Sequence, residues 1–142
     1  MNTDRRHPYA NPDSKIYWEA ANSGILLIRG CKACDAKHFL PRHHCPKCWS
    51  PDLAWIKASG VGSVYSFSII HRAPDEAFLT KVPFVIALVD LIEGPRMLAN
   101  IIGIGSLETS VGDEVKVTFE KMDFGYKLPQ FLLSKFTLNA IV

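Results

Sequence analysis

The 142-residue chain lacks the features that would place it in a membrane or secreted class. No apolar run approaches the ~20 residues of a membrane-spanning helix, so we expect no membrane segment. The start, MNTDRRHPYANPD, has no apolar signal core, which favours a cytoplasmic protein. Internal repeats and low-complexity segments are missing as well, and we expect no further domain after Val142.

Motifs that mark common enzyme classes are also missing. The chain contains no G-x-x-x-x-G-K-[ST], G-x-G-x-x-G, H-E-x-x-H or G-x-S-x-G. There is no residue pattern typical of a catalytic triad, a dyad or an open metal site. We therefore predict no catalytic residue and no catalysis by this chain alone. His71 and Arg72 place a base beside a cation, a pattern that is more typical of a solvated loop.

The chain has no large excess of charge of either sign. The formal net charge is +2, which argues against an electrostatic nucleic-acid binder. Residues 1–58 hold nine Lys/Arg against five Asp/Glu, whereas residues 59–142 hold seven against nine. Four thiolates around one Zn²⁺ would offset the positive charge of the first half, and a protein near neutrality tends to associate.

A short helix is expected near the N-terminus. Asn11 is suited to cap it, Pro12 to the first helical position, and Gly24 to its C-terminal end. The apolar spacing within 12–23 follows one helical stripe. A helix this short is marginal alone and must dock on another surface. We assign residues 1–24 to an N-terminal tail and helix.

Two C-x-x-C pairs, separated by ten residues, are the strongest signal in the chain. Each pair forms a sharp turn that directs two sulfurs at one point, and two such turns complete a tetrahedron with Zn–S bonds of ~2.3 Å. Four thiolates leave no open position for water, so the predicted role of the metal is structural. We predict one Zn²⁺ per chain in a ribbon over residues 25–58, with the ligands Cys31, Cys34, Cys45 and Cys48.

Other interpretations of the cysteines remain open. Two disulfides or a redox C-x-x-C are disfavoured by the expected compartment and by the lack of a thioredoxin-like βαβ pattern. Sulfur ligands alone do not distinguish zinc from iron. A histidine ligand is disfavoured because four cysteines suffice. Basic side chains surround the cysteines, and two interpretations of them remain: they offset the negative charge of the metal site, or they face an anion. These residues are Lys32, Lys37, His38, Arg42, His43, His44 and Lys47.

From Gly60 onward the pattern alternates with period two, which predicts half-buried strands. In the first of them, Tyr65, Phe67 and Ile69 share the face expected to be core. Five strands with no long helix between them suggest a closed OB-type barrel over residues 59–142. The predicted strands are 61–71, 83–92, 96–102, 115–119 and 131–141.

The order of these elements resembles a known family. The ribbon is followed by VYSFSIIHRAP (64–74), VPFVIALVDLIEGPRMLANIIG (82–103), VGDEVKVTFE (111–120) and GYKLPQF (125–131). This closely resembles the acyl-CoA-associated zinc-ribbon/OB-fold family, known by its domain-of-unknown-function number 35. The resemblance covers about 13–131, and all four cysteines match the metal ligands of the family.

The resemblance implies a mainly β fold with a short N-terminal helix, a rubredoxin-like zinc ribbon and a five-stranded OB barrel. It implies a non-catalytic subunit that joins a thiolase-fold enzyme in a hetero-oligomer and helps form the channel for CoA or acyl-CoA, which the two bind jointly. Such partners include thiolases, acyltransferases, synthases, aldolases and hydratases. His71 and Arg72 match the family stretch, and a cation suits the CoA phosphates, so they are the expected CoA contacts.

Two other functions compete with this one. OB folds and zinc ribbons both serve as nucleic-acid-binding modules, but the acidic barrel half and the expected core position of Tyr65 and Phe67 argue against it. A free-standing acyl-CoA or lipid binder is disfavoured because side chains fill the interior of a five-stranded barrel.

Overall fold

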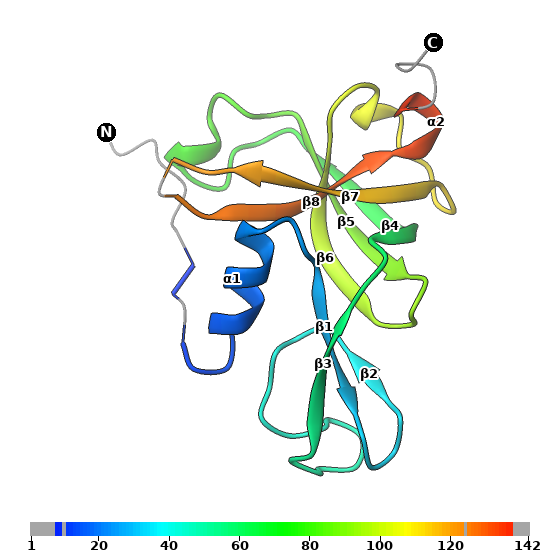
Figure 1. The fold of residues 1–142 in the computed structure, drawn as a ribbon. Coiled ribbons are helices and arrows are strands. Elements are labelled where there is room, and N and C mark those ends of the chain that lie inside the picture. The colour runs from blue at the N-terminus through cyan, green and yellow to red at the C-terminus, as the bar shows by residue number, and fades with distance from the viewer. Residues whose placement is uncertain (1–7, 10, 124, 138–142) are drawn as a thin grey trace.

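The computed structural model describes residues 8–9, 11–123 and 125–137. The chain forms two lobes, a small three-stranded ribbon and a closed five-stranded barrel, with one helix packed beside their junction (Figure 1). The predicted mainly β class with an OB-type barrel is confirmed. No helix of the described residues is long and apolar enough to cross a membrane.

The N-terminal helix α1 (Lys15–Asn22) is shorter than the predicted 12–23. Residues 12–14 form a turn, in which the Asn11 side chain accepts a hydrogen bond from the Ser14 amide at 2.9 Å. Tyr17 of α1 packs edge-on against Phe39 of the ribbon, and Trp18 packs in the same way against Tyr126 beside the barrel. The helix thus docks on both lobes, as its marginal length requires.

The ribbon consists of β1 (Leu27–Cys31), β2 (Lys37–His38) and β3 (Leu53–Lys57), in the order β2-β1-β3. All its pairings are antiparallel. The barrel follows without a linker, because the Ala58 amide bonds to the Leu26 carbonyl and extends the β1–β3 pairing to the edge of the barrel.

The barrel strands close in the order β4-β5-β6-β8-β7. Along β5, every second side chain is buried, as period-two alternation predicts. The core is made by the inward side chains of all five strands, with Phe131 at its centre among the largest buried residues. The strands are β4 (Val61–Ile70), β5 (Phe84–Leu91), β6 (Arg96–Ile102), β7 (Glu114–Lys121) and β8 (Lys127–Leu133), and the short helices are Glu76–Phe78, Ser106–Glu108 and α2 (Ser134–Thr137).

The expected core position of Tyr65 is wrong. Val64 is buried instead, and Tyr65 is 51% exposed. A bulge between Val64 and Ser66 shifts the register of β4 against β5 by one residue. Because side chains alternate with period two, one extra residue reverses which side chains face inward. Beyond the bulge, Phe67 and Ile69 pack against the core as predicted.

The last strand also differs from the predicted 131–141. It begins at Lys127, four residues before the predicted start, and ends at Leu133. Its antiparallel partner β7 begins at Glu114, and Val115 already pairs with Leu133, so β7 extends only one residue past this last pair. The chain turns into α2 instead, and the predicted strand positions 138–141 lie outside the described residues.

The barrel closes through a parallel contact between β6 and β8 that has few backbone pairs. Two side-chain amides complete this seam. The Gln130 side-chain oxygen accepts a hydrogen bond from the Asn100 backbone N–H at 2.8 Å, and the Gln130 side-chain nitrogen donates one to Asn100 Oδ1 at 3.0 Å. Asn100 in turn donates to the Val85 carbonyl of β5. Gln130 is buried, so these bonds satisfy polar groups that water does not reach.

We predict that Gln130→Leu destabilises the barrel by about 2–3 kcal/mol, because it leaves buried polar groups of Asn100 without partners. Urea unfolding of the metal-loaded chain measures this difference. Glu114→Gln, on the exposed side of β7, is the control and should change the free energy of unfolding by less than about 0.5 kcal/mol. Equal stability of Gln130→Leu and the native chain would contradict a structural role of the seam.

Candidate metal centre

The four cysteines lie at the tip of the ribbon, on two turns of the same geometry. Cys31 ends β1 and starts the first turn, and Cys45 starts the second. In each turn, the backbone N–H of the residue after the second cysteine donates a hydrogen bond to the carbonyl of the first cysteine. Asp35 donates to Cys31 and Trp49 donates to Cys45, both at 2.9 Å. This closes both turns into matching knuckles that face each other.

The four sulfurs converge on one point. Their ligand atoms all lie within 4.8 Å of one another. The Sγ atoms of Cys31 and Cys48 are 3.6 Å apart, as are those of Cys34 and Cys45. Ligands of a tetrahedral ion with bonds of ~2.3 Å lie roughly 3.8 Å from one another, so the group has the dimensions of a tetrahedral Cys₄ site. The four residues are free cysteines, not two disulfides.

The environment of Cys45 favours the thiolate that a metal binds. The backbone amides of Cys48 and Lys47 donate to its sulfur and lower the pKa of this thiol to about 7. The Lys47 nitrogen lies 3.4 Å from the Cys45 Sγ. Amide donors stabilise the charged form of a buried sulfur, so negative charge in this group is favoured on Cys45. Desolvation and the neighbouring sulfurs raise the pKa of the Cys34 and Cys48 thiols.

The histidines of the ribbon lie outside the sulfur group. Among the described residues, the ligand cluster contains cysteines alone. His43 instead forms an ion pair with Asp13 before α1. Burial, together with the positive charges of Arg29 and Arg42, lowers the pKa of His38. The four predicted ligands are therefore brought together, and the alternative of a histidine ligand is not supported.

His71 and Arg72 lie far from this centre. They are exposed and follow the last residue of β4, whose first residue adjoins the ribbon. A strand of 10 residues extends roughly 30 Å. The two residues therefore lie at the other end of the barrel, and their contact with CoA stays a prediction.

The residue after the second cysteine of each knuckle adopts a left-handed backbone. Asp35 has φ 60° and Trp49 has φ 65°. Short polar residues tolerate this region, but a bulky side chain there costs about 1–2 kcal/mol. Trp49 is also 76% exposed, so packing of its ring returns little of that cost. Sequence reasoning missed this residue, although an aromatic at a position suited to glycine is a signal that could have identified it.

We predict that Trp49→Gly stabilises the chain by about 0.5–1 kcal/mol, because glycine adopts the left-handed backbone without strain. Asp35→Gly is the matched control in the other knuckle and should give a smaller gain, since Asp tolerates this backbone. Chemical denaturation of the metal-loaded proteins measures both. A loss of stability in Trp49→Gly would show that the ring is held by packing.

Comparisons with known proteins agree with this architecture. Residues 18–54 match the family described as "ChsH2, rubredoxin-like zinc ribbon domain", and residues 55–120 match "ChsH2, C-terminal OB-fold domain". A solved structure of an "Ltp2-ChsH2(DUF35) aldolase" is similar with a TM-score of 0.80 and 35% identity, over 90% of this chain and 99% of that chain.

The chain spans 39% and 55% of the length of two curated relatives, both of which are enzyme subunits by name. A "Probable enoyl-CoA hydratase alpha subunit" from Thermomonospora curvata is 36% identical over 127 residues, which is 89% of this chain and 39% of that protein. The "Benzoylsuccinyl-CoA thiolase subunit BbsA" from Geobacter metallireducens is 33% identical over 84 residues, 58% of this chain and 55% of that protein. Since a ribbon with four convergent cysteines precedes a closed OB barrel, and the DUF35 aldolase structure matches at 35% identity over 99% of its chain, the chain belongs to the DUF35 family of zinc-ribbon and OB-fold proteins.

Proposed function

We propose that this chain is a non-catalytic, zinc-containing subunit of a thiolase-like acyl-CoA enzyme, and that it helps form the channel for the CoA thioester. The observation that carries the proposal is the likeness to the DUF35 chain of the Ltp2-ChsH2 aldolase, which extends over 99% of that chain. The other two relatives are, by name, subunits of an enoyl-CoA hydratase and a benzoylsuccinyl-CoA thiolase.

The metal part of the proposal assigns one Zn²⁺ to Cys31, Cys34, Cys45 and Cys48. The spacing of the sulfurs and the amide donors to Cys45 support this assignment. Zinc in a four-thiolate site has no open position, so it would hold the ribbon together and take no part in the reaction. The reacting groups would then come from the partner enzyme.

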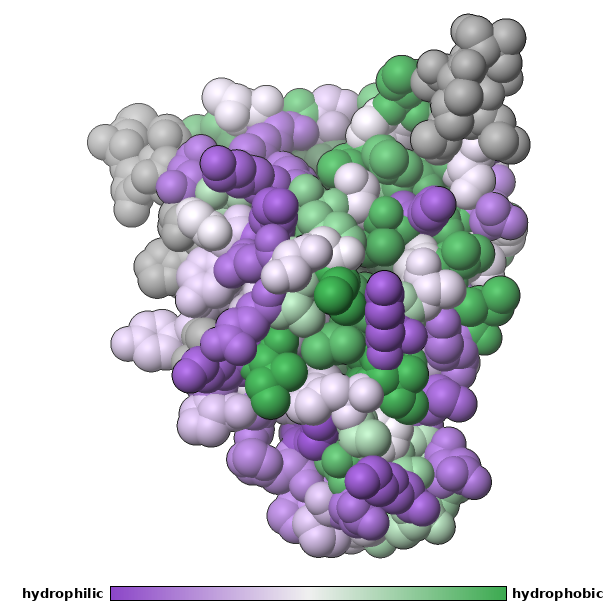
Figure 2. Space-filling model, in the orientation of Figure 1, coloured by the Kyte–Doolittle hydropathy of each residue, from purple (hydrophilic) through white to green (hydrophobic). Residues whose placement is uncertain are grey.

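Exposed apolar side chains support a partner surface on the barrel. Ile104, Leu107 and Val111 are exposed within one short segment between β6 and β7. Figure 2 shows further apolar side chains over the face where the ribbon meets the barrel. Large exposed apolar patches mark interaction sites, so these side chains are candidates for the partner surface.

The competing nucleic-acid function has weaker support. Tyr65 is exposed on the barrel, but the Arg96 guanidinium lies over its ring at 3.3 Å and occupies a face on which a base would stack. Residues 59–142 carry more acidic than basic side chains. A groove that follows a nucleic-acid strand needs the opposite balance.

We expect Cys34→Ser to lose its metal and much of the stability of the ribbon, because binding free energy at a structural zinc site is folding free energy. Element analysis of the purified protein measures the metal, and it also distinguishes zinc from iron. Ala33→Ser, in the same knuckle, is the matched control and should keep one metal ion per chain. Full metal content in Cys34→Ser would refute the four-cysteine assignment.

We further expect a thiolase-fold enzyme to co-purify with the tagged full chain from its native cell. Separated from this chain, that enzyme should lose at least tenfold of its kcat/KM for the acyl-CoA substrate, and adding the metal-loaded chain should restore it. Metal-free Cys34→Ser should fail to restore it. If the separated enzyme keeps its full kcat and KM, the proposed role is wrong.

A further inference from the structure

The central strand β5 is apolar on both of its faces. Val85, Ala87 and Val89 point inward and are buried, so Ile86 and Leu88 between them point outward. An antiparallel sheet with one face in water normally carries polar side chains at outward positions. Aliphatic side chains at these positions are suited to a second layer that covers the strand from outside.

The neighbouring strands extend this surface. Leu88 lies between Leu98 of β6 and Ser66 of β4, and Leu98 is 58% exposed. The next row of the sheet repeats the arrangement, with Ile86 in its centre. We call this surface the outer face, and its members are Ser66, Ser68, Ile86, Leu88, Leu98 and Asn100.

A fixed ion pair lies at one end of the outer face. The Arg96 Nε donates to Asp90 Oδ1 at 2.6 Å, its Nη2 donates to Asp90 Oδ2 at 3.2 Å, and its guanidinium stacks on the Tyr65 ring. The bulge of β4 is what places Tyr65 on the outside for this stacking. Both charges already have a partner, so a protein that covers this end leaves no isolated charge behind.

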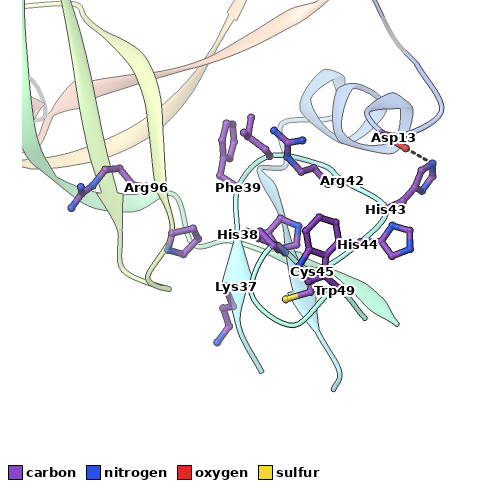
Figure 3. A pocket seen from close by; sticks show the side chains of 13 residues that line it. Asp13, Lys37, His38, Phe39, Arg42, His43, His44, Cys45, Trp49 and Arg96 are labelled. Carbon is purple, nitrogen blue, oxygen red and sulfur yellow. Dashed lines mark ion pairs between the residues drawn. The ribbon is translucent and has the colours of Figure 1, made fainter. Parts of the chain in front are cut away.

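Cations without a partner lie beside the same end. Lys37 and Arg42 of the ribbon line a cleft whose other wall is formed by Pro95 and Arg96 (Figure 3). Lys37 and Arg42 are exposed, and no hydrogen bond or ion pair of either side chain occurs among the described residues. In Figure 3 the side chains of Lys37, Arg42 and Arg96 point apart, so they do not converge on one small anion. Cations spread in this way fit carboxylates distributed over a protein surface.

The charges favour a different protein over the other two occupants of such a face. In OB folds, nucleic acid binds on the second and third strands of the barrel, which here are β5 and β6. The aliphatic and serine side chains of the outer face provide neither stacking rings nor cations for it. A second copy of this chain would bring the same cations. The single acidic residue of β4–β6, Asp90, is already bound to Arg96 and gives Lys37 and Arg42 no counter-charge.

We propose that the outer face is the docking surface for the enzyme subunit of the proposed function. That subunit contributes an apolar patch, which packs on Leu88 and Leu98, and carboxylates at the edge of the patch, which face Lys37 and Arg42. The inference rests on the proposed function, because that function supplies the partner. An apolar centre with a charged rim is the common anatomy of protein interfaces.

Binding of the partner enzyme to the metal-loaded full chain tests the proposal. The probe is the thiolase-fold enzyme that co-purifies with the tagged chain, separated from it and then titrated back in surface plasmon resonance. We expect Leu98→Glu to raise the Kd about 100-fold or more, because it places a charge inside an apolar contact. Ile16→Glu is the matched control, since Ile16 is an exposed apolar residue of α1, which packs on β1 and β8. This control should change the Kd less than about threefold, and metal content and urea unfolding show that both variants are folded.

A charge variant tests the rim separately. Arg42→Glu should lower the association rate constant about tenfold at low salt and much less at high salt, because salt screens the attraction between the two surfaces. Lys121→Glu, an exposed cation on β7, is the matched control and should leave the rate constant within about twofold. An association rate that Arg42→Glu does not change would overturn the placement of the carboxylates.

The outcomes separate this inference from the proposed function. If the enzyme binds Leu98→Glu as tightly as the native chain, the docking surface is wrong and the subunit role stands. The same holds if Ile104→Glu loses the enzyme and Leu98→Glu keeps it, which would assign the contact to the segment between β6 and β7. Light scattering should find the isolated chain monomeric, and a dimer that Leu98→Glu dissociates would show that a second copy covers the face. If no thiolase-fold enzyme binds the native chain, the proposed function fails and the docking surface fails with it.

Discussion

The ribbon depends on its cysteines because it has almost no hydrophobic core of its own. Within residues 27–57, the buried side chains are Ile28, Cys31 and Cys45, so two of these three belong to the sulfur group. So small a lobe buries too little apolar surface to offset the conformational entropy of ordering its loops. Convergence of four sulfurs on one point supplies the constraint that burial does not.

The orientation of the ribbon on the barrel follows from how the ribbon is attached. The Leu26–Ala58 hydrogen bond anchors the base of the ribbon to the barrel. On one side, α1 contacts the ribbon through Tyr17 and the barrel side through Trp18. Two separate attachments thus fix the angle between the lobes.

Sequence patterns predicted those parts of the structure that are set by interactions between residues close together in the chain. The C-x-x-C spacing predicted the knuckles because each ligand pair is set by a turn of a few residues. Alternation and apolar runs predicted the first four barrel strands to within two residues, since the faces of a strand show over a few positions, whereas the predicted fifth strand overlaps β8 only at 131–133. The resemblance carried by the stretches from 64 to 131 identified the family that the comparisons show.

The features that sequence reasoning missed depend on pairing between distant segments. The bulge that exposes Tyr65 is a property of β4 against β5, and the end of β8 is set by where β7 begins. The stacking of the Arg96 guanidinium on the Tyr65 ring also depends on the pairing of distant segments, and no sequence spacing encodes it. The sequence suggested that the histidines and cations of the ribbon either offset the charge of the metal site or bind an anion. It did not show that some of them lie beside Pro95 and Arg96 of the barrel.

The docking of α1 has a consequence for the order in which the protein is completed on the ribosome. The helix leaves the ribosome before the strands of the barrel, yet the Asn22 side chain accepts a hydrogen bond from the Lys127 backbone amide, 105 residues later in the chain. Eight residues of helix are too few to persist in water before that surface exists. The N-terminal segment therefore waits, exposed to chaperones and proteases, until the final strand of the barrel has been synthesised and paired.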